Sequence, residues 1–222
     1  MKTFEQLINE ENNDVVGIIN NLPKGAVLYR GFSGFKPTNL QKMKVPENRV
    51  PTDTPIQFHH RLDELFNKNF GIKARSDTLF CSKSFDMVER YAKDDDNIFI
   101  VVPINPSYIW STKVVDLFDS IFDTPLDKVL NEFYPSFDKS LFSSSDLKSR
   151  YKTLSNEGTK LFNEISDNVL NNIVKTYKKS SNLSQVNNNE VMVYCSDYYV
   201  ISYKDCKCTT YEQVQKYLEG LV

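Results

Sequence analysis

Short strand-like segments are scattered among helical segments along the whole chain, and this mixture constrains the fold more than any other feature of the sequence. Apolar runs typical of short strands occur at 25–31, 78–81, 97–103, 108–110, 190–195 and 199–203. Helical periodicity indicates helices at 3–21, 55–70, 84–91 and 209–221, and a mainly helical stretch from 114 to 179. Because the two kinds of element are interspersed without an internal repeat, we expect one α+β domain over 1–222 with a helical insertion at about 114–180.

Local signals fix some of the boundaries. Asp53 or Thr54 can cap the helix at 55–70, Pro55 suits its first turn, and Gly71 is expected to end it. The segments 31–53 and 180–189 are rich in turn residues or polar residues, so we expect loops there. The segments 190–195 and 199–203 are expected to pair as a hairpin.

Composition and charge exclude several classes of protein. The 222 residues carry a net charge of −2, which gives no general attraction for nucleic acid or an anionic membrane. There is no apolar run near the roughly 18 residues that a membrane span needs, and the N-terminus lacks the pattern of a signal peptide. The four cysteines and the adjacent His59 and His60 do not form a zinc-site pattern. We therefore expect a reduced, cytoplasmic protein without a metal or a membrane partner.

Three short motifs, far apart in the sequence, point to chemistry. The first is LYRG at 28–31, in which Arg30 ends a strand. The second is FCSKS at 80–84, in which Ser82 ends a strand that runs into a helix. The third is NNEVMV at 188–193, in which a polar loop delivers Glu190 onto the first residue of a strand.

This order of motifs resembles the Arg-Ser-Glu ADP-ribosyltransferases, the group that contains arginine-modifying toxins and several tailed-phage enzymes. The resemblance covers about residues 25–203, apart from the insertion. It implies an ADP-ribosyltransferase-like core of two small, roughly perpendicular β-sheets around an NAD cleft, flanked by helices. It also implies that NAD is the substrate, that no metal is needed, and that Arg30, Ser82 and Glu190 are the catalytic residues.

The chemistry needs these residue types. Breaking the nicotinamide–ribose bond creates an oxocarbenium-like centre, and a fixed carboxylate such as Glu190 stabilises its charge. Ser82 is expected to orient that carboxylate. The guanidinium of Arg30 can bind the diphosphate of NAD and also hold the neighbouring backbone in place. The resemblance implies that the backbone of Gly31 contacts the nicotinamide amide. Phe85 is expected either to stack on the nicotinamide or to join the core.

The sequence departs from the family pattern at two positions. Asn188 stands two residues before Glu190, where arginine-modifying relatives carry a second glutamate. A neutral amide cannot take a proton from an acceptor guanidine, although it can hydrogen-bond an acceptor. Lys83 replaces the central threonine of the Ser-Thr-Ser segment, and its side chain is expected to point away from Glu190.

Other conspicuous residues favour structural roles. His59 and His60 are adjacent on a helix and point about 100° apart, so we expect structural or surface positions for them. Trp110 is expected in the core, and the acidic run 94–96 is expected to be a solvated turn.

The expected reaction is therefore transfer of ADP-ribose from NAD to a macromolecular acceptor with release of nicotinamide. The acceptor is expected to be a host protein side chain, with RNA as the alternative, and the resemblance favours a toxin-like bacteriophage effector acting in the host or bacterial cytoplasm. Two other functions stay open: an NAD glycohydrolase on the same fold, and a catalytically inactive binding or virion-associated module.

Overall fold

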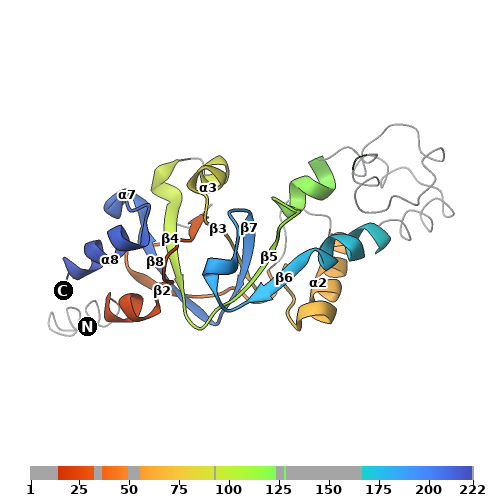
Figure 1. Ribbon diagram of the computed structural model, residues 1–222, viewed down its shortest axis with the longest axis horizontal. Coiled ribbons are helices and arrows are strands. Elements are labelled where there is room, and N and C mark those ends of the chain that lie inside the picture. The colour runs from red at the N-terminus through yellow and green to blue at the C-terminus, as the bar shows by residue number, and fades with distance from the viewer. Residues whose placement is uncertain are drawn as a thin grey trace. The chain divides into compact units, whose positions relative to one another are not determined.

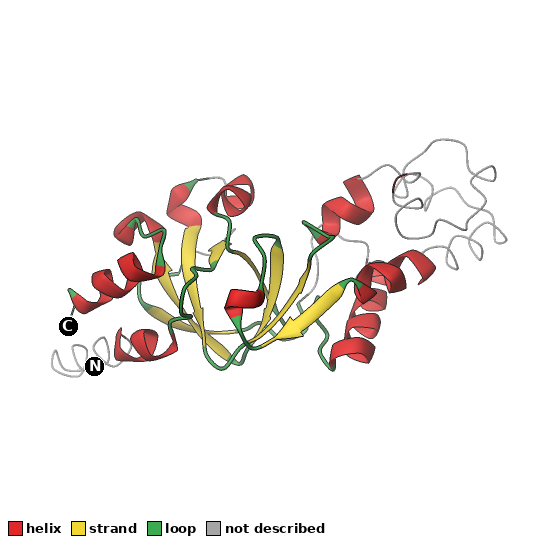
Figure 2. Cartoon of the chain, in the orientation of Figure 1, coloured by secondary structure: helices red, strands yellow, loops and turns green. Residues whose placement is uncertain are grey.

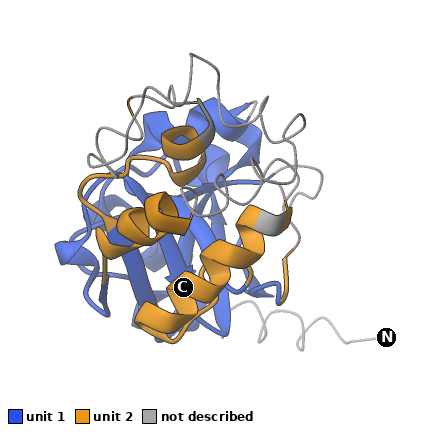
Figure 3. Ribbon diagram, turned by 90° about the vertical axis from the view of Figure 1, so that its right-hand side faces the viewer, with its two compact units in different colours: residues 1–47, 77–110, 179–222 blue, residues 48–76, 111–178 orange. Residues whose placement is uncertain are grey.

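The structure, a computed structural model, describes most of the chain outside its N-terminus and one long internal stretch. The described residues are 15–32, 37–49, 56–92, 94–123, 128 and 167–221. The expectations for 3–14, for the helix cap at 53–55 and for most of the helical stretch at 124–166 lie outside these residues. The chain divides into two compact units (Figure 3): unit 1 comprises 1–47, 77–110 and 179–222, and unit 2 comprises 48–76 and 111–178.

Eight strands make up the sheet. They are β1 (Tyr29–Gly31), β2 (Gln41–Lys44), β3 (Leu79–Ser82), β4 (Ile98–Pro103), β5 (Ser107–Ser111), β6 (Tyr177–Ser180), β7 (Glu190–Tyr194) and β8 (Asp197–Ser202). Their order is β2-β8-β4-β1-β3-β7-β5-β6 (Figure 1). Together with the helices around them (Figure 2), they confirm the α+β class. The sequence predicted two small sheets, whereas hydrogen bonding joins the strands into one.

An antiparallel ribbon contributes a pair of strands to each half of the strand order. β4 pairs with β8 as far as Pro103↔Tyr198, and β5 pairs with β7 from Ser107↔Tyr194 onward. The register is the same on both sides of the connection at 104–106, where Asn105 has a positive φ of 48°. The predicted hairpin between the segments at 190–195 and 199–203 is therefore wrong, because β7 and β8 pair with β5 and β4 instead of with each other.

Two strands occupy segments for which the sequence predicted other structure. β2 lies in the expected loop at 31–53 and pairs with β8 along its whole length, from Gln41↔Val200 to Lys44↔Asp197. β6 begins at Tyr177, where a helix was expected to continue to 179. β2 and β6 are the outermost strands, and both carry lysines. Charged side chains on edge strands oppose pairing with other chains.

The helices of unit 1 are a helix at 15–21, α3 (Phe85–Ala92), α7 (Tyr203–Cys206) and α8 (Tyr211–Glu219). One apolar cluster joins these helices to β1, β4 and β8 through Ile18, Val88, Ile100 and Leu218. A second cluster uses the alternate residues of the same strands, including Phe99, and extends onto β3, β5 and β7. Successive side chains of a strand point to opposite faces, so the two clusters cover the two faces of β1 and β4.

Unit 2 contains α2 (Ile56–Phe70), a π-helical turn at Asp119–Asp123 and a helix at 167–175. The prediction of α2 is confirmed, and Gly71 ends the helix with a φ of 71° as its N–H donates to the Asn67 carbonyl at 2.8 Å. Within this unit, the rings of Phe66 and Tyr177 meet edge to face at 5.0 Å.

Candidate active site

The three motifs lie on three neighbouring strands. β1, β3 and β7 follow one another in the sheet, and the ladder places Tyr29 opposite Ser82 and Ser82 opposite Glu190. Arg30 is the next residue after Tyr29, so the backbone positions of Arg30, Ser82 and Glu190 are neighbours across the sheet. Pairing between distant parts of the chain has thus brought the motifs together: the hydrogen-bonded residues Arg30 and Phe80 are 50 positions apart, and Ser82 and Asn188 are 106 positions apart.

Arg30 braces the junction between β1 and β3. One of its terminal nitrogens, Nη1, donates a hydrogen bond of 2.9 Å to the carbonyl of Phe80. The guanidinium carbon lies 5.2 Å from the centre of the Phe32 ring, within cation–π range. Its Nε is buried and has no hydrogen-bond partner within the part of the chain that the structure describes. The guanidinium therefore has one donor committed to the backbone and at least one buried donor that a ligand could use.

Ser82 holds the loop that precedes Glu190. Its buried hydroxyl donates a hydrogen bond of 2.9 Å to the backbone carbonyl of Asn188 and accepts one of 3.0 Å from the N–H of Ser84. The sulfur of Met87 lies 3.6 Å from the same hydroxyl. The sequence predicted that Ser82 orients the Glu190 carboxylate, and this hydrogen bond orients the backbone two residues before it.

The charges of Arg30 and Glu190 both act on one thiol. Burial raises the pKa of Cys81 to about 12; Arg30 lowers that pKa, while Cys195 and Glu190 raise it. Cys81 immediately precedes Ser82 on β3. The guanidinium and the carboxylate therefore lie within electrostatic reach of the same point at the end of β3.

The side chains do not all leave the same face of the sheet. Arg30 pairs with Phe99, whose side chain belongs to the second apolar cluster, and residues that pair across a ladder share a face. Ser82 pairs with Tyr29, which belongs to the first cluster. Arg30 and Ser82 thus point to opposite faces of the sheet.

Gly31 and Phe85 have packing roles. A Cβ added at Gly31 would lie 3.1 Å from the Cβ of Ala92, so the missing side chain lets β1 pack closely against α3. Phe85 stacks at a tilt against Tyr203, with ring centres 4.4 Å apart, and meets Tyr29 edge to face at 5.6 Å. Of the two roles expected for Phe85, these contacts support the core. The contact between Gly31 and nicotinamide stays a prediction.

Lys83 makes a contact that the sequence did not predict. Its Nζ donates a 2.6 Å hydrogen bond to the carbonyl of Val186, in the loop that leads to Glu190. That its side chain points away from Glu190 stays a prediction. The side chain of Asn188, in the same loop, is exposed. The path of this loop past the end of β3 depends on tertiary packing, so no local signal could have revealed the contact.

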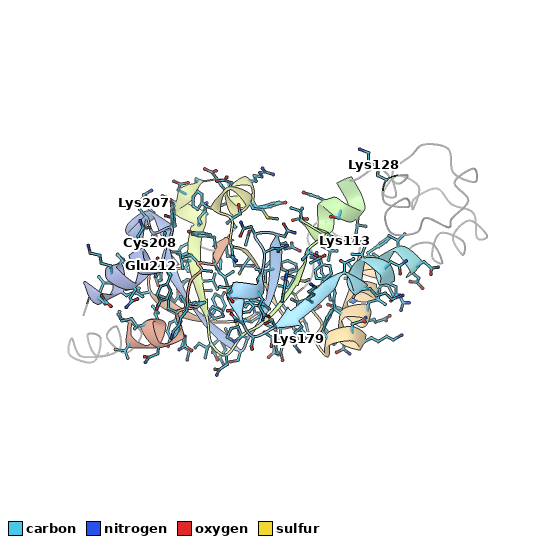
Figure 4. The ribbon with its side chains drawn as sticks, in the orientation of Figure 1. Lys113, Lys128, Lys179, Lys207, Cys208 and Glu212 are labelled. Carbon is cyan, nitrogen blue, oxygen red and sulfur yellow. The ribbon has the colours of Figure 1, made fainter. Side chains whose placement is uncertain are left out.

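The remaining conspicuous residues lie away from these strands. Trp110 is in the core, as predicted, and His60 is exposed while His59 is buried. The acidic run 94–96 forms a surface turn that includes a short 3-10 helix at Asp95–Asn97; Asp94 is exposed, and the half-buried Asp96 pairs with Lys204 at 2.8 Å. Lys207, which Figure 4 labels beside Cys208 after α7, lies 3.8 Å from Asp95. The predicted surface turn is thus confirmed, with lysines as its partners.

A separate pocket of about 340 Å³ lies in unit 2. His59, Asp63 and Ser76 are among the residues that line it. The Ser76 hydroxyl bonds the Asp63 carboxylate and lies 2.9 Å from Nε2 of His59, while Asp63 also accepts the N–H of Arg75 at 2.7 Å. In a catalytic triad the carboxylate binds the far nitrogen of the imidazole, whereas here it binds the serine directly. The arrangement anchors the turn at 73–76 to α2.

No group of three His, Cys, Asp or Glu side chains among the described residues could hold a metal ion, and none of their helices has the length and apolar character of a membrane span. Comparison with family models, with curated proteins and with solved structures gave no match. The geometry of the strands and their side chains is therefore the basis for a functional proposal.

Proposed function

We propose that the chain is an NAD-dependent ADP-ribosyltransferase of the Arg-Ser-Glu type. The observation that carries the proposal is the ladder Tyr29↔Ser82↔Glu190, which joins the three motifs at one end of β3. Any one motif is common in proteins, whereas their convergence on adjacent strands requires a particular tertiary fold. The proposal includes an ADP-ribosyltransferase-like core, in which β2-β8-β4-β1 and β3-β7-β5-β6 correspond to the two expected sheets. A single registered pair, Tyr29↔Ser82, links these two groups between β1 and β3.

The residues present fit a dinucleotide. The buried Nε of Arg30, which has no hydrogen-bond partner among the described residues, is a donor suited to a diphosphate oxygen. The Nη1 hydrogen bond to Phe80 limits the motion of the guanidinium, so this side chain would lose little conformational entropy on binding a ligand. The charge of Glu190 near the same strand end is suited to a positively charged ribose centre.

In the proposed reaction the C–N bond between ribose and nicotinamide breaks, and its electron pair leaves with nicotinamide. Glu190 stabilises the positive charge that develops on the ribose. A nucleophilic atom of the acceptor then forms a bond to the same ribose carbon and loses its proton to water. Asn188 can hydrogen-bond the acceptor but cannot remove that proton, so an acceptor that reacts without a carboxylate base at residue 188 fits this site best.

The proposal is tested with the purified full-length chain, labelled NAD and a bacterial lysate as the source of acceptor. A transferase releases nicotinamide in step with the appearance of label in protein, or in RNA if nucleic acid is the acceptor. A glycohydrolase releases nicotinamide together with free ADP-ribose.

An inactive module gives neither product, and its folded state gains no stability from NAD. A ligand that binds only the folded state stabilises it by roughly 2.7 kcal/mol at a hundred times its Kd, so a melting curve with millimolar NAD separates binding from inertness. Absence of both nicotinamide release and a shift in Tm would contradict the proposal.

A further inference from the structure

The loop that leads into Glu190 is attached to the end of β3 at regular intervals. The carbonyl of Val186 accepts a hydrogen bond from Lys83, and the carbonyl of Asn188 accepts one from Ser82. Glu190 then pairs with Ser82 in the ladder. Every second residue from 186 to 190 is therefore held by either Ser82 or Lys83, which are consecutive residues of the second motif.

Packing and a local turn also order parts of this loop. Leu183 and Val186 are buried in the second apolar cluster, so the start of the loop is held by packing. From 187 to 189 the chain is three asparagines, whose short polar side chains favour several turn conformations. The N–H of Asn189 donates to the side chain of Asn187 at 3.2 Å, which orders the turn locally.

Lys83 supplies the stronger of the two side-chain attachments. A hydrogen bond from a charged donor is shorter and stronger than one between neutral groups, and the Lys83–Val186 distance of 2.6 Å is shorter than the 2.9 Å of Ser82–Asn188. Burial lowers the pKa of Lys83 from its ordinary value, which shows that the ammonium is partly removed from water. A charge that has lost hydration depends more on its protein partner.

We propose that Lys83 is a positioning residue that, together with Ser82, clamps the segment 186–188 and so sets where Glu190 enters β7. Its effect on catalysis rests on the proposed function, because it acts through the placement of the Glu190 carboxylate. The effect of Lys83 on the loop does not depend on the proposed function. The two can therefore be measured separately.

The test compares three variants of the full-length chain with wild type. Lys83→Met removes the ammonium and keeps an apolar stem, and Lys83→Arg keeps a charged donor. Lys216→Met removes an exposed lysine from α8 and serves as the matched control. Amide hydrogen exchange of peptides spanning 186–191 is measured without ligand, followed by steady-state nicotinamide release from NAD.

Lys83→Met is expected to speed exchange at 187–190 by roughly tenfold or more, since a hydrogen bond to a charged group is lost, while peptides from β4 and α8 stay unchanged. Its kcat is expected to fall by roughly tenfold to a hundredfold with KM for NAD changed by less than about threefold, because a misplaced carboxylate weakens mainly the transition state. Lys83→Arg is expected to restore much of the slow exchange at 187–190 and much of kcat. Lys216→Met is expected to behave as wild type.

Unchanged exchange at 187–190 in Lys83→Met would overturn the clamp. Faster exchange with an unchanged kcat would overturn the positioning role. If wild type itself released no nicotinamide, the proposed function would fail, and the exchange result alone would still decide whether Lys83 holds the loop.

Discussion

Arg30 offers hydrogen-bond donors in two fixed directions, which a lysine at this position could not do. Its guanidinium bonds the Phe80 carbonyl through one nitrogen and presents a buried Nε for a further acceptor. A lysine keeps the charge but has no planar fork that can bond two groups in fixed directions. We expect Arg30→Lys to raise KM for NAD by roughly tenfold or more and to lower the free energy of unfolding by about 1–2 kcal/mol.

The matched control for Arg30→Lys is Arg90→Lys, on the exposed side of α3, which should leave both quantities within error. The measurements are nicotinamide-release kinetics and urea unfolding. If Arg30→Lys were active with an unchanged KM, the guanidinium would not contribute to the proposed binding of NAD.

Gly31 marks the closest approach of β1 to α3. An added Cβ would lie 3.1 Å from the Cβ of Ala92 and 3.3 Å from its Cα, so part of the contact is with backbone that cannot rotate away. We expect Gly31→Ala to lower the free energy of unfolding by about 1–3 kcal/mol, as overpacking does.

A double-mutant cycle with Ala92→Gly tests this cause, since removing the Ala92 methyl should recover part of the loss in urea unfolding. Gly220→Ala, where the nearest contact would be 3.5 Å, is the control and should not destabilise. If the two substitutions changed the free energy of unfolding additively, a clash with the Ala92 methyl group would not be the cause of the destabilisation by Gly31→Ala.

At the scale of the elements, α2 and the turn after it are joined by a buried network that responds to pH. Burial is the main cause that lowers the pKa of His59 from 6.5, and the nearby Asp63 carboxylate partly raises it. The folded state therefore binds the His59 proton less tightly than the unfolded state does. Stability should be fully present above about pH 6.5 and should fall as the pH decreases through the folded pKa.

The loss amounts to about 1.4 kcal/mol for each unit by which the folded pKa lies below 6.5. Urea unfolding between pH 7.5 and 5.0 should show a steeper loss for wild type than for His59→Gln. His60→Gln, which changes the exposed neighbour on the same helix, should keep the wild-type slope. Equal slopes for wild type and His59→Gln would assign the pH dependence to other groups.

Periodicity predicted most of the elements that the structure describes, but not how the strands pair. α2, α3, β3, β4, β5 and β7 lie close to where the sequence placed them, because their apolar patterns are local. β2 was missed because its segment is dominated by turn residues, although Met43 alternates with the exposed Lys42 and Lys44. The expected hairpin failed because the partners of β7 and β8 are set by the register of the long ribbon, which is a non-local property.

At the scale of the whole chain, the sequence selected candidate site residues but could not predict their geometry. The order of the motifs selected Arg30, Ser82 and Glu190, and the ladder at β3 supports their grouping. That Ser82 and Lys83 hold backbone carbonyls of the 186–188 segment could not be predicted, since those hydrogen bonds form only when the loop passes β3. Residue types can suggest a reaction, whereas which atoms meet depends on tertiary packing.

Glu190 is the residue on which the proposed transfer of ADP-ribose from NAD most directly depends. The direct measurement is incorporation of label from NAD into a bacterial lysate by wild type, by Glu190→Gln and by the control Glu212→Gln, which changes an exposed glutamate on α8 (Figure 4). Glutamine keeps the shape of the side chain without its charge, so transfer by Glu190→Gln should fall by about a thousandfold or more while Glu212→Gln matches wild type. Equal labelling by wild type and Glu190→Gln would contradict the account.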